Sequence, residues 1–311
     1  MNALSVILCT HNPRDAYLKR VLQSLELQTL PRDRWEFIVV DNASSPALEP
    51  RLDLSWHPQA CVLREDVVGI TSARLCGFRA ATAELVVCVD DDNVLSPDYL
   101  EQALRIGASY PFIGAWGGAI DGEFEQPPAE WLLPHLELLA VRPAEGEMWS
   151  NLYGSWVSTP IGAGMCLRRQ VVDAYLASLA SQPGRMILGR AGSSMVSSED
   201  IDIAYHAIDI GMGCGRFPAL RLTHLIPKAR CARAYILRLV EGTAESQVYL
   251  DWFRSKGVLE RIARLRADQV LRLRLRDMLD RGINGAIQIA KQRGRERAYR
   301  RLDAGELSLS E

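Results

Sequence analysis

Short apolar runs alternate with amphipathic segments through the first part of the chain. Residues 4–9, 36–41 and 85–90 are six-residue apolar runs, a length typical of buried strands. Four residues between the first two runs recur at helical spacing: Leu18, Val21, Leu22 and Leu25. A strand–helix–strand unit makes its two strands parallel and buries them on both faces. The sequence therefore predicts an α/β fold with a mostly parallel, twisted sheet flanked by helices.

The same alternation continues further along the chain. It predicts strands over 61–64, 112–120, 161–167, 214–217 and 220–224. It predicts helices over 71–82, from Pro97, over 170–180, over 199–210 and through most of 232–301. Residues 121–160 are rich in Pro and Trp and show no steady period, so we expect long loops with short elements there, either over a binding cleft or as a plain excursion. A Gly- and Ser-rich loop is expected over 184–198.

The composition is that of a globular protein. The 311 residues are 48% hydrophobic and 24% charged, which excludes wholesale disorder and low-complexity repeats. Apolar runs stay far below the roughly 20 residues that cross a bilayer, and the first residues lack the basic region of a signal peptide. The seven cysteines form no CxxC pair, which favours reduced thiols over a disulfide framework or a zinc site. We therefore expect a cytoplasmic protein.

The charge is distributed unevenly. Residues 1–255 contain 22 Lys and Arg against 30 Asp and Glu, a net charge of −8, whereas residues 256–301 contain 14 against 5, a net charge of +9. A basic helix of this kind either packs on the body with a solvated face, which we favour slightly, or binds an anionic membrane surface. Nucleic acid is disfavoured because the acidic body would repel phosphates and only Tyr299 interleaves the arginines as a stacking residue.

Polar residues follow the predicted strands, at the sheet edge where ligands of open α/β folds bind. The strongest signal is Asp90-Asp91-Asp92, directly after the apolar strand 85–90. Three adjacent carboxylates repel one another, and a hard divalent cation is the usual remedy. An acidic turn near a helix N-terminus is the plainer alternative.

Two further positions have a functional and a structural interpretation. Asp200 lies in the first turn of the predicted helix 199–210, where it is either a general base or part of a capping box with Ser197. His224 follows a short predicted strand, and a lone histidine is more often structural than a ligand. Beside a carboxylate-bound metal it would become an extra ligand and favour Mn²⁺ over Mg²⁺.

Taken in order, these segments resemble family 2 glycosyltransferases with the GT-A fold. The matching segments are Cys9–Pro13, Val39–Ser44, Gly69–Gly77, Val89–Leu95 and Ser198–Asp200, within a similarity over about residues 3–230. The resemblance implies a GT-A catalytic domain over 1–230, and the helical pattern and basic charge beyond it predict a helical, basic extension over 231–311. It implies metal-dependent, inverting transfer of a hexosyl group from a nucleotide-diphosphate sugar, with UDP favoured. The acceptor would be a hydroxyl of a saccharide or lipid-linked molecule in surface polysaccharide or glycoconjugate synthesis, at the cytoplasmic side and in peripheral contact with the inner face of the membrane.

The resemblance also implies roles for individual residues that bind the donor. These are Thr10, Asp41, Arg74, Asp90 and Asp91. Asp41 would hydrogen-bond the base. Thr10 and Arg74 would line the nucleotide and its diphosphate, and Asp90 would face the ribose and the metal.

The remaining implied roles concern the metal and the chemical step. Asp92, the second acid of the DxD motif, would ligate Mn²⁺ or Mg²⁺ together with His224, and Asp200 would be the catalytic base. Residues 162–169 resemble the family's small-residue strand under the sugar. The family usually has Asn after the arginine of its third segment, and here Leu75 stands instead.

Two alternatives belong to other functional classes. The spacing of Asp90 and Asp92 also matches a haloacid-dehalogenase-type phosphatase, in which the first Asp is the nucleophile and the second an acid/base. Release of phosphate without a sugar acceptor would favour that enzyme. A non-enzymatic nucleotide-sugar-binding scaffold is the other alternative, and nucleotide binding without turnover would support it.

Overall fold

The computed structural model describes residues 2–254 and 282–306. Its strands are Leu4–Thr10 (β1), Trp35–Asn42 (β2), Ala60–Glu65 (β3), Leu85–Asp90 (β4), Asn93–Leu95 (β5), Ile113–Phe124 (β6), Met148–Ser150 (β7), Cys166–Arg168 (β8) and Gly213–Ile226 (β9). Its α-helices are Asp15–Glu26 (α1), Ile70–Ala80 (α2), Tyr99–Ser109 (α3), Arg169–Ser181 (α4), Glu199–Asp209 (α5), Arg233–Arg254 (α6) and Ile283–Asp303 (α9). Short 3₁₀ helices are Arg32–Arg34 (η1), Glu49–Arg51 (η2), Glu130–Leu139 (η3), Pro183–Leu188 (η4) and Lys228–Cys231 (η5).

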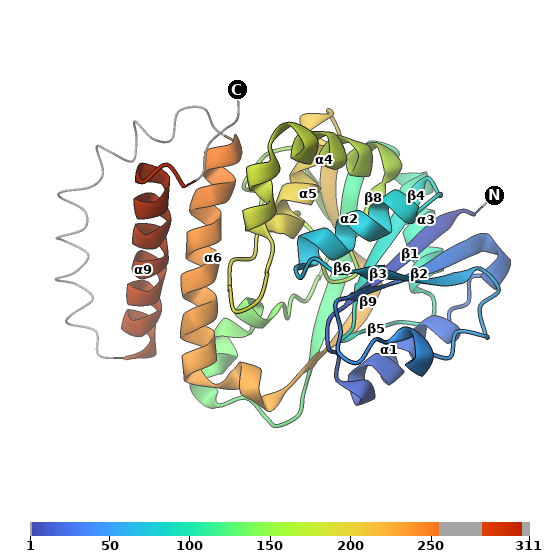
Figure 1. Cartoon of the computed structure of the whole chain (residues 1–311), viewed down its shortest axis with the longest axis horizontal. Helices are drawn as coiled ribbons and strands as arrows, with labels where there is room; N and C mark the ends of the chain where they lie inside the picture. The colour runs from blue at the N-terminus through green and yellow to red at the C-terminus, as the bar shows by residue number, and fades with distance from the viewer. Residues whose placement is uncertain (1, 255–281, 307–311) are drawn as a thin grey trace.

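The strands form one sheet in the order β3-β2-β1-β4-β8-β6-β9-β5, with β7 paired to β9 (Figure 1). The first four strands in this order are parallel, as the strand–helix–strand pattern predicts. β8 is antiparallel to both of its neighbours, and β5 and β7 are antiparallel to β9. The predicted α/β fold is confirmed. Its parallel part brings the carboxyl ends of β1, β2 and β4 to one edge, where Thr10 lies opposite Asp41 and Cys9 opposite Asp90.

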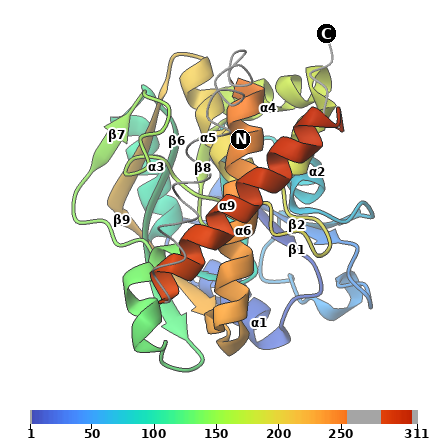
Figure 2. The ribbon, with the colours of Figure 1, turned by 90° about the vertical axis from the view of Figure 1, so that its left-hand side faces the viewer.

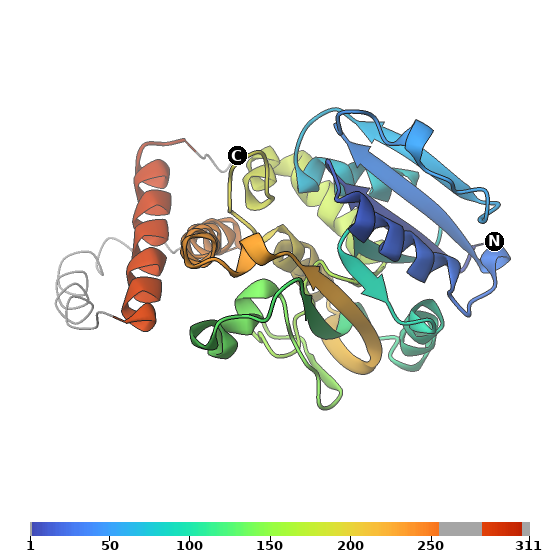
Figure 3. The same cartoon turned by 90° about the horizontal axis from the view of Figure 1, so that it is seen from below.

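Two hydrophobic cores lie on opposite faces of the sheet, and β1 shows how the sequence divides them. Leu4, Val6 and Leu8 point into the core formed with α1 and α3. Ile7 and Cys9 point into the core formed with α2, α4 and α5. Successive side chains of a strand face opposite sides, so an unbroken apolar run is what a strand covered on both faces requires. Figure 3 shows the helices on either side of the sheet.

The second half of the sheet differs from the prediction in two places. The strands expected over 214–217 and 220–224 are one long, irregular strand, β9, which pairs with β6 across register shifts. Gly118 of β6 permits this close approach, because a Cβ there would lie 1.9 Å from the carbonyl oxygen of Leu220. The three-residue strand β5 was not predicted. It places Asn93 opposite His224 and so carries the Asp90–Asp92 turn to the end of β9.

The strand predicted over 161–167 is mostly a turn. Only Cys166–Arg168 is a strand, because Gly164 adopts a φ of +69°, which residues other than glycine rarely adopt. A Cβ on Gly164 would also lie 2.3 Å from the hydroxyl oxygen of Tyr99. The region expected to be loops over 121–160 contains the end of β6, η3 and β7, and its residues 138–140 line the cavity described below.

The C-terminal helix α9 packs along α6, on the side of α6 that faces away from the sheet (Figures 1 and 2). The two helices approach closely at Gly294, where a Cβ would lie 2.0 Å from the carbonyl oxygen of Glu241. Arg297 pairs with Glu241 and, at 3.1 Å, with Glu245. For α9 the predicted packing of the basic segment is confirmed, whereas residues 255–281 lie outside the described residues. Membrane contact stays a prediction.

Helices in the described ranges 2–254 and 282–306 do not combine the length and apolar character needed to cross a membrane.

We predict that Gly294→Ala destabilises the protein by about 1–3 kcal/mol, because the added methyl group meets the backbone of α6. In an isolated helix the same change would stabilise the helix by about 1 kcal/mol. The sign of the change in stability therefore shows whether the close contact with α6 exists. Thermal unfolding measures it, and limited proteolysis shows whether α9 has come away from α6. Gly146→Ala is the control, since a Cβ there meets nothing within 4 Å. A Gly294→Ala protein as stable as wild type would contradict this close contact.

Candidate functional site

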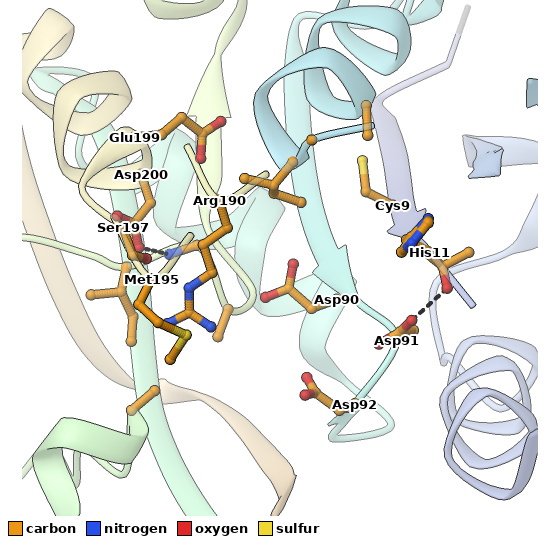
Figure 4. A pocket seen from close by; sticks show the side chains of 18 of the residues that line it. Cys9, His11, Asp90, Asp91, Asp92, Arg190, Met195, Ser197, Glu199 and Asp200 are labelled. Carbon is orange, nitrogen blue, oxygen red and sulfur yellow. Dashed lines mark hydrogen bonds between the residues drawn. The ribbon is translucent and has the colours of Figure 1, made fainter. Parts of the chain in front are cut away.

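A cavity of about 550 Å³ lies at the carboxyl ends of β1 and β4. Its walls come from segments that are far apart in the sequence: the β1 end, the start of α2, the Asp90–Asp92 turn, residues 161–163 and 190–197, the start of α5, and the β9–η5 connection. Figure 4 shows Asp90, Asp91 and Asp92 on one side, with Glu199, Asp200 and Arg190 facing them. The structure therefore brings together the two acidic motifs that the sequence indicated, 110 positions apart along the chain from Asp90 to Asp200.

The three adjacent aspartates each have a different partner. Asp90 lies 3.4 Å from the guanidinium of Arg74, and burial raises its pKa. Asp91 accepts a hydrogen bond from the hydroxyl of Thr10. Burial, reinforced by the charges of its two neighbours, raises the pKa of Asp91 to about 7 against the opposing effect of that hydrogen bond. Each carboxylate thus has its own partner, while burial and the predicted mutual repulsion still raise the pKa of Asp90 and Asp91.

Asp92 lies in a cluster with His224 and Arg230. Its Oδ2 is 3.0 Å from Nη1 of Arg230 and 3.4 Å from Nε2 of His224. His224 Nδ1 lies 2.9 Å from the carbonyl oxygen of Leu139, which fixes the proton on Nδ1 and leaves the lone pair of Nε2 facing the cavity. Burial alone would raise the pKa of Asp92. His224, when its ring carries a second proton on Nε2, and Arg230 outweigh burial and hold that pKa below its usual range.

Sequence analysis missed Arg230. It lies on η5, six residues after His224, and its Nη1 is 3.0 Å from His224 Nε2. One basic residue in a connection that also contains Lys228 gives no distinguishing signal. Only the fold shows the role of Arg230, because it places η5 against the Asp90–Asp92 turn.

 

Arg74 forms a buried ion pair that joins three elements. Its guanidinium, 4% exposed, binds Glu199 at the start of α5 as well as Asp90 at the end of β4. Burial raises the pKa of Glu199 to about 7, although the charge of Arg74 opposes this shift. Arg74 was predicted to line the diphosphate. It does line the cavity, but within the described residues its guanidinium pairs with two carboxylates of the protein.

Asp200 faces the cavity from the first turn of α5. Its Oδ2 accepts a hydrogen bond of 2.9 Å from the backbone N–H of Gly162, and its Oδ1 accepts one of 2.9 Å from that of Ile201. The capping box considered for Ser197 and Asp200 is not formed. The helix begins after Ser198, whose side chain instead donates to the hydroxyl of Ser246 at 2.8 Å. The carboxylate is thus held by a neighbouring segment, with its orientation fixed from two sides.

Asp41 is not placed on the cavity wall. Its carboxylate is 2% exposed and accepts hydrogen bonds from the backbone N–H groups of Ser44 and Leu48, and Arg64 pairs with it at 2.7 Å. These contacts hold the turn after β2. His11 and Asn42 line the cavity at this end instead. The base contact implied for Asp41 stays a prediction, and it would require the carboxylate to exchange one of these partners.

The chemistry of Asp92 and His224 fits a divalent cation. A carboxylate oxygen and an imidazole nitrogen with a fixed tautomer converge there, and phosphate oxygens of a substrate commonly complete such a shell. Across the described ranges, groups of three or more His, Cys, Asp and Glu side chains able to hold an ion do not occur. Arg230 currently bridges both donors, so it would have to leave this position when an ion enters.

Comparison with known proteins identifies the family. The sequence profile described as "Glycosyl transferase family 2" matches residues 5–176, more than half of the chain. The chain belongs to glycosyltransferase family 2. The resemblance found in the sequence is therefore confirmed. This family 2 chain is 30% identical over 105 residues to EpsH of Bacillus subtilis (strain 168), which is provisionally named a glycosyltransferase. The match covers 33% of this chain and 30% of EpsH.

Other relatives agree with this assignment. Validoxylamine A glucosyltransferase of Streptomyces hygroscopicus subsp. limoneus is 33% identical over 113 residues, covering 34% of this chain and 24% of that protein. The match thus spans less than a third of either curated relative. Among solved structures, S. aureus TarS 1–349 in complex with UDP-GlcNAc aligns with a TM-score of 0.53 and 15% identity over 81% of this chain and 70% of that chain. This likeness supports the GT-A fold.

We predict that Arg74→Met destabilises the protein by about 3–5 kcal/mol, because it leaves the buried carboxylate of Glu199 and the half-buried one of Asp90 without their cation. The loss should grow as the pH rises through about 7. Glu199 is protonated below that pH and ionised above it, and the ionised form is the one that needs Arg74. Thermal unfolding at pH 6 and pH 8 measures both effects. The control is Arg79→Met, an exposed arginine of the same helix. A small, pH-independent loss would contradict this account.

Proposed function

We propose that the protein is an inverting glycosyltransferase that moves a sugar from a nucleotide-diphosphate sugar to a hydroxyl group of an acceptor. The observation that carries the proposal is the position of Asp200, across one cavity from the Asp90–Asp92 turn, in a chain of glycosyltransferase family 2. A carboxylate on one side and an acidic turn on the other leave space between them for a donor sugar and its diphosphate.

The shape of the cavity suggests how the donor is oriented. His11, Asn42 and Val68 line the end near β2, which suits the nucleoside. Gly162 and Ala163 lie beside Asp200, and their small size leaves room for the sugar. The diphosphate would then lie between them, next to Asp92. The bound UDP-GlcNAc of the structural neighbour TarS supports uridine as the nucleoside of the donor.

Asp200 would be the base of the reaction. The acceptor hydroxyl attacks the anomeric carbon while Asp200 takes its proton, since a hydroxyl is far too weakly acidic to ionise at neutral pH. The N–H groups of Gly162 and Ile201 hold the carboxylate in place for this step. A single displacement inverts the anomeric configuration and requires no covalent intermediate with the protein.

Asp92 and His224 would hold a divalent cation, Mn²⁺ or Mg²⁺, together with the donor. When bound, such an ion neutralises negative charge that develops on the leaving diphosphate. His224 keeps Nε2 available through its contact with Leu139, and Asp92 stays ionised because of its basic neighbours. Arg230 provides the positive charge at this place when the ion is absent.

The acceptor and the cellular location belong to the same proposal. We propose a saccharide or lipid-linked acceptor in surface polysaccharide or glycoconjugate synthesis, used at the inner face of the membrane. All seven cysteines lie within the described residues and are unpaired, which fits a reducing compartment. The arginines on the outer face of α9 are available for a peripheral contact with anionic lipids: Arg293, Arg295 and Arg300 are exposed.

The two alternatives are not favoured. A phosphatase of the haloacid-dehalogenase type would use Asp90 as nucleophile, but this carboxylate faces Arg74, and the chain belongs to a glycosyltransferase family. A binding scaffold is not favoured either, because the chain belongs to a glycosyltransferase family.

We predict that chelation of divalent ions weakens donor binding at least about tenfold, and that Asp92→Ala does the same, because the diphosphate then lacks its counter-charge. Calorimetric titration with UDP, with Mn²⁺ or with EDTA, measures the affinity. Asp33→Ala, which removes an exposed aspartate on η1, is the control. Undiminished affinity in excess EDTA would remove the metal from the mechanism.

We predict that Asp200→Asn lowers turnover by roughly 10²-fold or more, because the amide still accepts the Gly162 hydrogen bond but cannot take a proton. Donor affinity and melting temperature should change little. Sugar transfer to an acceptor, or donor hydrolysis, is the assay, and Asp173→Asn on the exposed face of α4 is the control. If the variant retains wild-type turnover, Asp200 has only a structural role.

A further inference from the structure

Arg190 places a guanidinium in the cavity that the sequence motifs did not indicate. Figure 4 shows its side chain between Asp200 and the Asp90–Asp92 turn. Its Nε is buried and has no hydrogen-bond partner, and the side chain makes no ion pair with any described residue. A buried donor without a partner is unfavourable, and it is uncommon in folded proteins. A ligand that accepts a hydrogen bond from Arg190 would therefore supply the missing partner.

The other two arginines of the cavity are already occupied. Arg74 pairs with Glu199 and Asp90, and Arg230 pairs with Asp92. Among the described residues that line the cavity, Arg190 is thus the cation whose charge is left for a ligand.

The loop that carries Arg190 is fixed from two sides. Its backbone carbonyl accepts a hydrogen bond of 3.0 Å from the N–H of Ile70 at the start of α2. The preceding Gly189 lies so close to α2 that a Cβ there would be 1.9 Å from the hydroxyl oxygen of Thr71. On the other side, the carbonyl oxygen of Met195 would be 2.3 Å from a Cβ on Gly242 of α6. Arg190 is therefore held at a defined place over the cavity.

The ligand that fits this place is a phosphate group. A guanidinium presents a planar fork of N–H donors that matches phosphate oxygens. Carboxylates outnumber guanidinium groups in the cavity, so an anion that enters it needs a cation facing it. The five carboxylates are those of Asp90, Asp91, Asp92, Glu199 and Asp200, and the three guanidinium groups are those of Arg74, Arg190 and Arg230. Arg190 lies between the turn at which the diphosphate is expected and the base Asp200. In the proposed orientation of the donor, the phosphate attached to the sugar would lie there.

We infer that Arg190 binds the sugar-proximal phosphate of the donor and stabilises the leaving diphosphate; this rests on the proposed function. In the step itself, the acceptor oxygen forms a bond to the anomeric carbon and its proton passes to Asp200. The bond from the anomeric carbon to the phosphate oxygen breaks, and its electron pair stays on that oxygen. Arg190 donates hydrogen bonds to the phosphate on which this charge appears.

The test compares a nucleoside diphosphate with the matching monophosphate, which lacks the phosphate in question. Wild type, Arg190→Met and Arg190→Lys are titrated with UDP and UMP, after a panel of UDP, GDP, ADP, CDP and dTDP has shown which base the wild type binds. Arg105→Met, which removes an exposed arginine that hydrogen-bonds to Gln102, controls for the loss of one positive charge. Melting temperatures are measured for all variants.

We expect Arg190→Met to weaken diphosphate binding at least tenfold and monophosphate binding less than twofold, with Arg190→Lys intermediate and Arg105→Met unchanged. The turnover of Arg190→Met should fall as well. Wild-type affinity of Arg190→Met for the diphosphate, or an equal loss for both nucleotides, would overturn the role of Arg190 and leave the proposed function standing. If the wild type binds no nucleoside diphosphate of the panel, the proposed function itself is wrong, and this inference falls with it.

Discussion

The buried guanidinium of Arg74 is the interaction on which the site depends. It is nearly inaccessible to water, and it pairs with one carboxylate at the end of β4 and another at the start of α5. Removing water from three charged groups is favourable only when they stay together. The pair therefore fixes α5 against the sheet. Gly162 packs on the same guanidinium, since a Cβ there would lie 2.4 Å from Nη2 of Arg74, and its N–H binds Asp200. The orientation of the proposed base thus follows from Arg74.

Charge in the cavity is balanced by specific pairs. Two of the five carboxylates, Asp91 and Glu199, have a pKa raised to about 7 by burial, so each is partly neutral near physiological pH. Asp92 remains charged because His224 and Arg230 face it. Asp90 pairs with Arg74 and Asp92 with Arg230, which lessens the repulsion that an anionic donor meets. An unpaired acidic cavity of the same composition would repel a diphosphate.

The sequence was sufficient for features that depend on local pattern. The apolar runs of β1, β2 and β4 predicted the parallel part of the sheet, and the polar residues at their ends predicted the position of the cavity. Features that depend on packing between distant segments were missed. β5 has three residues and forms because β9 lies beside it. Arg190 and Arg230 are single charged residues in ordinary surroundings, and their roles come from what the fold places opposite them. Glu199 lies in the matched segment Ser198–Asp200, but only the fold shows its pairing with Arg74.

The Asp90–Asp92 turn shows why a motif and a site are different things. In the sequence, three adjacent carboxylates suggest one cation shared among them. In the structure their side chains diverge: Asp90 faces α2, Asp91 faces β1, and Asp92 faces the β9–η5 connection. Only Asp92 meets a nitrogen ligand, that of His224. Two protein donors are a weak site for a divalent ion on its own. Stable binding would then require oxygens of the donor diphosphate and movement of Arg230, so the ion and the donor should depend on each other for binding.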